Sequence, residues 1–213
     1  MERKIILFDL DGTLTDSGSG IMHGMEIVLT HYGLPVPDRQ ALRVIVGPPL
    51  RGSFIRFGVD PEKTDEAVKI YREFYVAEGQ YENEVYPGVP ELLRSLKEQG
   101  CRLFVATSKP EAMAQNILKH FGLDGYFERI CGAAEDRSRD TKSKVIQYLL
   151  GQIRKDLPVV MVGDTFYDVE GAAELGIPTI GVDWGYGENE DMLRAGAVAI
   201  AMDTKQLQEL LLA

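Results

Sequence analysis

Apolar residues follow two different patterns along this chain, and the change between them comes near residue 85. Short apolar runs, the first of them at 5–8, have the length and composition of buried strands. Between 15 and 84, apolar residues instead recur at helical spacing, as at Ile21 and Met25. The chain therefore predicts a stretch of helices placed directly after its first strand.

The order of the other elements follows from the same patterns. The predicted strands cover 5–8, 102–106, 126–131, 159–162, 178–182 and 198–201. The predicted helices cover a segment that closes at Gly33, then 38–46, 61–78, 89–99, a segment from Pro110, then 142–153, 166–175 and a last segment from Asp203. Strands that alternate with helices predict a parallel sheet with helices on both faces.

The predicted fold class is therefore α/β, with a Rossmann-like parallel sheet in a three-layer α/β/α core. The segment 15–84 interrupts the alternation of strands and helices and contains no predicted strand. We interpret it as an inserted all-helical cap domain, and residues 1–14 with 85–213 as the core domain.

Composition and charge narrow the class of protein without changing this organisation. The chain has 213 residues, 45% hydrophobic and 26% charged, which is ordinary for a soluble globular protein. Its apolar runs are far shorter than a membrane span and no secretory signal precedes the first strand, so we expect a cytoplasmic protein without membrane association. A formal net charge of −10 argues against nucleic-acid binding. Cys101 and Cys131 lack metal or redox spacing and are expected in the core.

The candidate chemistry begins where the first apolar run ends. Asp9 and Asp11 follow that run with Leu10 between them, and residues two apart on a strand point to the same side. Two carboxylates on one face repel each other, and Mg²⁺ relieves the repulsion by binding carboxylates together with phosphate oxygens. Gly12 lets the backbone approach a ligand closely. The plainer alternative is an acidic turn, because Asp-Gly is a common turn signal.

Polar residues also follow two later strands. They are Thr107, Ser108 and Lys109 after 102–106, and Asp164, Thr165 and Asp168 after 159–162. In open α/β sheets ligands bind beyond the carboxyl ends of the strands, so these groups are candidates for one shared site. Asp164 alone would by default be a helix cap, but three such strand ends weaken that interpretation. The segment 184–187 is expected to form a loop at the border of the site.

Taken in order, these motifs resemble those of the haloacid dehalogenase superfamily, in its phosphatase branch. The resemblance rests on 9–13, 105–108, a lysine near Lys142, and 163–168, which together span nearly the whole chain. The helical insert resembles the small cap of phosphoglycolate-phosphatase-like members. Ser108 departs mildly from the pattern, because many members have asparagine there.

The resemblance implies a role for each position. Asp9 would be the nucleophile that forms an aspartyl-phosphate, and Asp11 would act as general acid and then as general base. Mg²⁺ would be held by Asp9, the backbone carbonyl of Asp11, and Asp164. The phosphate-binding groups would be Gly12, Thr107, the backbone N–H of Ser108, and Lys142, with Asp168 and Thr165 in supporting positions.

Two lysines compete for the cationic position. Neither Lys142 nor Lys144 is followed by proline, as is frequent in the superfamily. Lys142 is preferred because it starts its helix beside Thr141, a suitable cap, whereas Lys144 would face elsewhere.

Three further residues are candidate substrate contacts. They are Arg51 and His23, both in the helical insert, and Lys109 after the second strand. Each also has a plainer interpretation, as a surface arginine, an ordinary histidine and a solvated lysine respectively.

The leading hypothesis is a Mg²⁺-dependent phosphatase that hydrolyses a small phosphorylated metabolite through an aspartyl-phosphate. Phosphoglycolate, a nucleoside monophosphate and a sugar phosphate all fit, since a closing cap favours small substrates. A phosphomutase of the β-phosphoglucomutase kind shares the motifs, and a non-catalytic phosphoacceptor or regulatory protein is the alternative from another class. Receiver modules lack a helical insert after the first strand, and a dehalogenase needs neither Mg²⁺ nor an acid at Asp11. The sequence leaves the substrate and the oligomeric state open.

Overall fold

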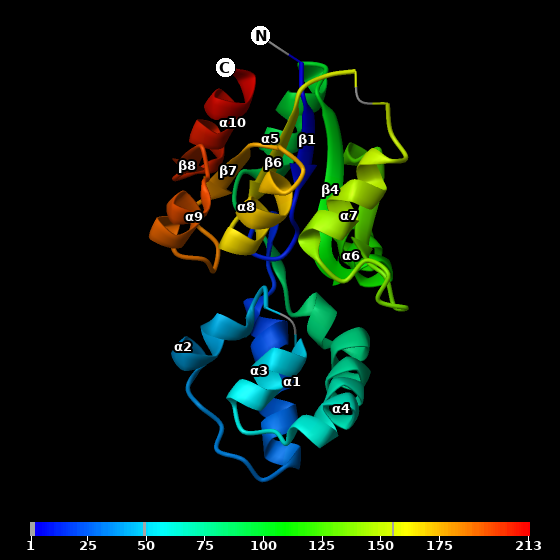
Figure 1. The fold of residues 1–213 in the computed structure, drawn as a ribbon, viewed down its shortest axis with the longest axis vertical. Coiled ribbons are helices and arrows are strands. Elements are labelled where there is room, and N and C mark those ends of the chain that lie inside the picture. The colour runs from blue at the N-terminus through cyan, green and yellow to red at the C-terminus, as the bar shows by residue number, and fades with distance from the viewer. Residues whose placement is uncertain (1–2, 49, 155) are drawn as a thin grey trace. The chain divides into compact units, whose positions relative to one another are not determined.

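The computed structural model describes residues 3–48, 50–154 and 156–213 (Figure 1). The chain divides into two compact units. The core unit comprises the chain up to Thr15 together with Val85–Ala213, and the helical unit comprises Asp16–Glu84.

The core unit is built on a six-stranded sheet in the order β5-β4-β1-β6-β7-β8. All five pairings between neighbouring strands are parallel. The strands are β1 (Ile5–Phe8), β4 (Arg102–Pro110), β5 (Arg129–Ala133), β6 (Val159–Gly163), β7 (Thr179–Val182) and β8 (Ala199–Ala201). The predicted α/β fold class with a Rossmann-like parallel sheet is confirmed.

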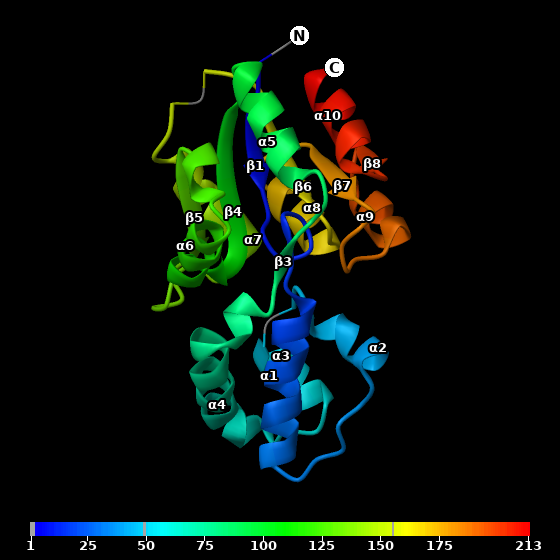
Figure 2. The same ribbon diagram turned by 180° about the vertical axis from the view of Figure 1, so that it is seen from behind.

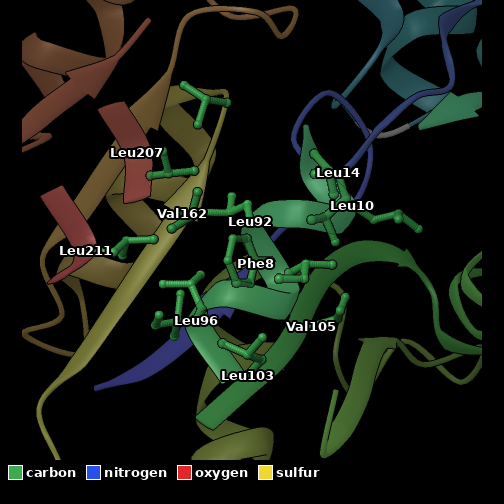
Figure 3. Packing of buried hydrophobic residues seen from close by; sticks show 14 of the residues in the cluster. Phe8, Leu10, Leu14, Leu92, Leu96, Leu103, Val105, Val162, Leu207 and Leu211 are labelled. Atoms are coloured by element: carbon green, nitrogen blue, oxygen red, sulfur yellow. The ribbon is translucent and has the colours of Figure 1, made fainter. Parts of the chain in front are cut away.

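Helices cover both faces of this sheet (Figures 1 and 2). They are α5 (Val89–Glu98), α6 (Glu111–His120), α7 (Lys142–Leu150), α8 (Phe166–Ala173), α9 (Asn189–Ala195) and α10 (Thr204–Leu212), with the 3₁₀ turn η4 at Asp124–Tyr126. Ile6 and Phe8 of β1 pack with α5, α6 and α10 on one face, and Figure 3 shows Phe8 among Leu92 and Leu96 of α5. Ile5 and Leu7 pack with α7 and α8 on the other face.

The burial of the central strand β1 explains why it is apolar and why Asp9 and Asp11 come only after it. Both faces of the strand are covered, so all four of its residues are apolar and fully buried. Phe8 lies between Val105 of β4 and Val162 of β6, and the polar residues beyond these three positions lie at one edge of the sheet. Leu10 turns back into the apolar core, leaving Asp9 and Asp11 outside it.

The helical unit contains α1 (Gly18–His31), α2 (Arg39–Leu42), α3 (Leu50–Arg56) and α4 (Thr64–Ala77), with 3₁₀ turns η1 (Arg43–Ile45), η2 (Pro61–Lys63) and η3 (Gly79–Tyr81). Gly24 lets α1 approach α4 closely, because a Cβ there would lie 2.5 Å from the ring of Tyr71. His23 of α1 also contacts Phe74 of α4, with ring centroids 4.4 Å apart. Aromatic side chains thus contribute to the packing between these two long helices.

The prediction that 15–84 holds no strand is wrong at both ends of the segment. Strands β2 (Thr15–Asp16) and β3 (Glu84–Val85) pair as a separate two-stranded sheet. Each has two residues, too few for an alternating pattern to reveal it.

Among the residues that the structure describes, no helix combines the length and the apolar character needed to cross a membrane.

Candidate active site

Lys142 lies at the centre of a buried group of oxygen atoms at the carboxyl edge of the sheet. Its Nζ is 2.8 Å from Asp9 Oδ1 and 2.6 Å from Asp168 Oδ1, and it donates to the carbonyl of Ala106 at 3.0 Å. Thr141 caps the helix that presents this lysine, accepting a hydrogen bond from the N–H of Lys144. The ammonium therefore ties the end of β1 to α7, α8 and β4.

Asp168 is held by the start of its own helix. Its Oδ2 accepts hydrogen bonds from the N–H of Thr165 at 3.1 Å and from the hydroxyl of Thr165 at 2.9 Å, which forms a capping box. Its other oxygen contacts Lys142. Since both oxygens are engaged, Asp168 is placed to orient the lysine.

Asp164 precedes that helix and does not cap it, because Thr165 is the N-cap residue. Asp164 Oδ1 accepts a hydrogen bond from the hydroxyl of Thr13 at 3.3 Å, and Oδ2 accepts one from the N–H of Tyr186 at 2.9 Å. Trp184 donates from its indole N–H to the carbonyl of Thr13. The loop 184–187 therefore borders the site, as expected.

The acidic side chains in this group exceed the cations beside them. Oxygens of Asp9, Asp164 and Asp168 lie within 4.8 Å of one another, and all three residues are buried. Burial raises the pKa of Asp9 to about 6, although Lys142 opposes the rise. Burial, with Asp168 and Asp9 nearby, also raises the pKa of Asp164 well above its usual value. Three carboxylates thus share one ammonium.

A hard divalent cation fits this donor set. Carboxylate oxygens are the ligands that Mg²⁺ prefers, and a second positive group would remove the repulsion between Asp9 and Asp164. Asp9 and Asp164 belong to the predicted metal site, whereas the carboxylate of Asp11 is not part of the cluster. The backbone carbonyl of Asp11 as a ligand stays a prediction.

Asp11 instead faces Lys109. Lys109 Nζ lies 3.0 Å from Asp11 Oδ1 and 2.9 Å from Asp11 Oδ2, and the lysine side chain is only 5% exposed. The interpretation of Lys109 as a solvated lysine is therefore wrong. Lys109 belongs to β4, two positions beyond Thr107, and both residues are buried while Ser108 between them is exposed.

Thr107 and Ser108 lie at the same edge of the sheet. Thr107 is buried, and its side chain hydrogen-bonds Asp9 and accepts from the N–H of Lys109 at 3.2 Å. Ser108 is exposed. Thr107 thus supports Asp9, and the phosphate contacts of Thr107 and of the Ser108 backbone N–H stay predictions.

Gly12 lies against Asp164. Its φ is +81°, and a Cβ at this position would come within 2.0 Å of Asp164 Oδ2. Replacing Gly12 by alanine is expected to lower the affinity for Mg²⁺ by at least about tenfold, since it displaces a proposed ligand. Calorimetric titration with MgCl₂ measures this affinity.

Gly122→Ala is the matched control, because Gly122 has a φ of +66° and a Cβ there would meet no atom within 4 Å. It should cost about 1–2 kcal/mol of unfolding free energy from backbone strain and leave the Mg²⁺ affinity unchanged. Equal affinities for the two variants would contradict the role of the close approach at Gly12.

Comparison with known proteins agrees with this geometry. The family model of haloacid dehalogenase-like hydrolases matches residues 6–182. This chain belongs to the haloacid dehalogenase-like hydrolase family. The predicted superfamily, its phosphatase branch and the assignment as a hydrolase enzyme are confirmed.

Three similar proteins illustrate the range of names in this family. The tyrosine-protein kinase PtkA of Mycobacterium tuberculosis is 43% identical over 212 residues, covering 98% of this chain and 72% of the relative. The 5'-nucleotidase of Pseudomonas aeruginosa is 42% identical over 194 residues, covering 89% and 86%. A solved structure of a predicted phosphatase from Clostridium acetobutylicum superposes with a TM-score of 0.92 at 40% identity, covering 100% and 99%.

Within this haloacid dehalogenase-like chain, the structure separates the two competing lysines. Lys142 is buried between Asp9 and Asp168, whereas Lys144 is exposed and pairs with Asp140 at 2.7 Å. The geometry therefore favours Lys142 for the cationic position.

The two charged candidates of the insert belong to the helical unit. Arg51 pairs there with Asp65, and His23 pairs with Glu82. Contact of either residue with a substrate stays a prediction.

Two parts of the site were not assigned from the sequence. The hydroxyl of Thr13 and the N–H of Tyr186 hold Asp164, and neither was given a role. Thr13 carried a usable signal, because it lies two positions beyond Asp11 in the first motif. The N–H of Tyr186 carried none, since a backbone donor is independent of the side chain.

Proposed function

We propose that this protein is a Mg²⁺-dependent phosphatase that hydrolyses a small phosphorylated metabolite through an aspartyl-phosphate on Asp9. The observation that carries the proposal is the buried cluster in which Lys142 bridges Asp9 and Asp168 while Asp164 lies alongside. Its uncompensated negative charge suits a bound cation together with a phosphate. The 5'-nucleotidase and phosphatase names of similar proteins support the same reaction class.

In the first half-reaction, a carboxylate oxygen of Asp9 forms a bond to phosphorus while the bond to the leaving oxygen breaks. Asp11 donates a proton to that leaving oxygen. Lys142, tied to Asp9, restricts the orientation of the nucleophile and supplies positive charge next to it. Burial alone lowers the pKa of the Lys142 ammonium, but Asp168 and Asp9 raise the pKa above its usual value, so this lysine stays charged.

The transferring phosphoryl group needs donors on its other oxygens. The proposed donors are the backbone N–H of Ser108 and the hydroxyl of Thr107, which would turn its O–H from Asp9 to a phosphate oxygen when substrate binds. Gly12 leaves room for the phosphate to approach. Mg²⁺, held by Asp9, Asp164 and the carbonyl of Asp11, would supply charge neutralisation that lets an anionic nucleophile approach a phosphate.

In the second half-reaction, a water oxygen bonds to phosphorus and the bond from phosphorus to Asp9 breaks, with its electron pair returning to the carboxylate. Asp11 accepts the proton of that water. The enzyme is regenerated and inorganic phosphate leaves.

The direct test is phosphate release from a panel of phosphorylated metabolites by purified protein with MgCl₂. The panel contains phosphoglycolate, nucleoside monophosphates and sugar phosphates, with p-nitrophenyl phosphate as a general probe. Release from at least one metabolite above the rate with p-nitrophenyl phosphate is expected. No release from any of them would overturn the proposal.

Removing the metal should abolish this activity. Excess EDTA is expected to lower phosphate release by at least about 10³-fold, because the carboxylates then repel both each other and the substrate phosphate. Adding MgCl₂ beyond the EDTA should restore the rate, and phosphate release measured through such a cycle checks it. Calcium, which prefers more ligands and longer bonds, serves as the control ion and should restore little. Full activity in EDTA would contradict the metal site.

The relative named a tyrosine-protein kinase favours a second candidate, phosphoryl transfer to a tyrosine. Incubation with ATP and MgCl₂, followed by detection of phosphotyrosine on this chain or on added protein, distinguishes it from hydrolysis. A phosphomutase would instead isomerise a sugar phosphate and require a sugar bisphosphate primer. Product analysis by ³¹P NMR separates the three reactions.

A further inference from the structure

Lys109 brings a second buried ammonium to the edge of the sheet where Asp9 lies. Its Nζ contacts both oxygens of Asp11, at 3.0 and 2.9 Å. We propose that Lys109 is a positioning residue that holds Asp11 in place for its proton transfer in the second half-reaction. This inference rests on the proposed function, since it concerns the residue that would accept the proton of water.

The contact geometry carries the inference. An ammonium shared between both oxygens of one carboxylate restricts the rotation of that carboxylate more than a single contact does. The side chain of Lys109 is 5% exposed and that of Asp11 is 13% exposed, so little water is present to replace the pair. A general base must lie within hydrogen-bond reach of the proton that it removes, and loss of its orientation slows that step directly.

The backbone around Lys109 belongs to strand β4. The residue lies between Ala106 and Pro110, which pair with Cys131 and Ala133 of β5 across a shift in register. Its N–H donates to Thr107 Oγ1 at 3.2 Å, and Thr107 in turn hydrogen-bonds Asp9. Asp11, in contrast, lies in a turn in which Thr13 and Leu14 both donate to the carbonyl of Leu10. The lysine thus links the turn that bears Asp11 to strand β4.

The step to be tested is the hydrolysis of the aspartyl-phosphate. The bond from the water oxygen to phosphorus forms, the bond from phosphorus to Asp9 breaks with its electrons returning to Asp9, and the water proton passes to Asp11. With p-nitrophenyl phosphate the leaving group departs without a proton, so the first half-reaction depends little on Asp11. A defect in positioning Asp11 should therefore appear in kcat and not in kcat/KM.

Stopped-flow kinetics of Lys109→Met with p-nitrophenyl phosphate and saturating MgCl₂ tests this. We expect a burst of about one p-nitrophenol per enzyme, then a kcat lowered at least about 10-fold, with kcat/KM within about threefold of the parent. Lys144→Met, which removes an exposed lysine, is the matched control and should show no change in either constant. Circular dichroism verifies that the variants fold. If Lys109→Met does not fold, Lys109→Gln, which keeps an uncharged N–H donor group, takes its place. It should show the same lowered kcat with a nearly unchanged kcat/KM.

A double variant separates positioning from other roles. Asp11→Asn should produce the same burst, and Asp11→Asn with Lys109→Met should be no slower than Asp11→Asn alone, within about twofold. Lys109→Arg should recover most of kcat, because a guanidinium also binds a carboxylate through two donors. A fall in kcat/KM as large as that in kcat, without a burst, would show that Lys109 binds the substrate phosphate and would overturn the inference. Absence of any turnover by the parent enzyme would overturn the proposed function and this role with it.

Discussion

Replacing Asp9 by asparagine is expected to lower phosphate release by at least about 10⁴-fold, the scale on which loss of a catalytic nucleophile acts. An amide keeps the shape of the side chain but lacks the anionic oxygen that attacks phosphorus. It also removes one of the three clustered carboxylates, so Mg²⁺ should bind more weakly. Phosphate release with p-nitrophenyl phosphate and MgCl₂ measures the loss.

Two controls sharpen this test. Asp191→Asn changes an aspartate that pairs with Arg194 on the outer helix α9, and it should retain the parent rate. Rapid acid quenching of the parent enzyme, followed by mass spectrometry, should find one phosphoryl group on the peptide that contains Asp9. Undiminished turnover by Asp9→Asn, or a phosphoryl group on another residue, would sink the assignment of Asp9 as nucleophile.

The central part of the site could be predicted from the sequence because its positions follow from strand ends. β1 is buried on both faces, so its apolar run and its end at Phe8 were recognisable, and the acids beyond it stood out. The end of β6 was recognisable to within one residue for the same reason, whereas β4 continues beyond the predicted end at Ala106 to Pro110. Parallel strands bring such ends to one edge of a sheet, so residues far apart in the chain could be grouped from the sequence alone.

The strand predicted over 126–131 is present, but its bounds were wrong. The structure gives β5 as Arg129–Ala133 and places Tyr126 in the 3₁₀ turn η4. Tyr126 and Phe127 are apolar because they pack against the main core outside the strand. The ring of Phe127 contacts that of Phe8 edge to face, with the ring centroids 6.2 Å apart. A run of apolar residues thus indicates burial, but the buried residues need not form a strand.

Short helices were also missed, since periodicity needs length. Helix α9 has seven residues and one buried side chain, Met192, while Leu193 beside it is 53% exposed. Its remaining signal is Gly196, whose φ of +105° ends the helix.

Lys109 was ambiguous for a different reason. A lysine after a strand is usually solvated, and its partner Asp11 lies 98 positions away in the chain.

Lys142→Met should be the variant with the largest combined effect on stability and activity. It removes the ammonium that contacts Asp9, Asp168 and the carbonyl of Ala106, and leaves buried carboxylates without their counter-charge. Breaking a buried ion pair from one side typically costs about 3–5 kcal/mol, so the free energy of unfolding should fall by that amount. Urea denaturation followed by circular dichroism measures it, and phosphate release should fall by about 10³-fold, as for loss of one stabilising donor.

The losses of stability and of activity in Lys142→Met have different origins, so a second variant should restore one without the other. Adding Asp168→Asn removes the carboxylate that Lys142 would neutralise, while the amide oxygen is retained for the hydrogen bonds from Thr165, so about half of the lost stability should return. Activity should not return, because Asp9 still lacks its ammonium. Lys144→Met, two positions along α7, removes an exposed pair and should change stability by less than about 0.5 kcal/mol. If Lys142→Met were as stable as Lys144→Met, the buried charges would have to be neutral in the folded protein, and Lys142 could not be what keeps Asp9 ionised for attack.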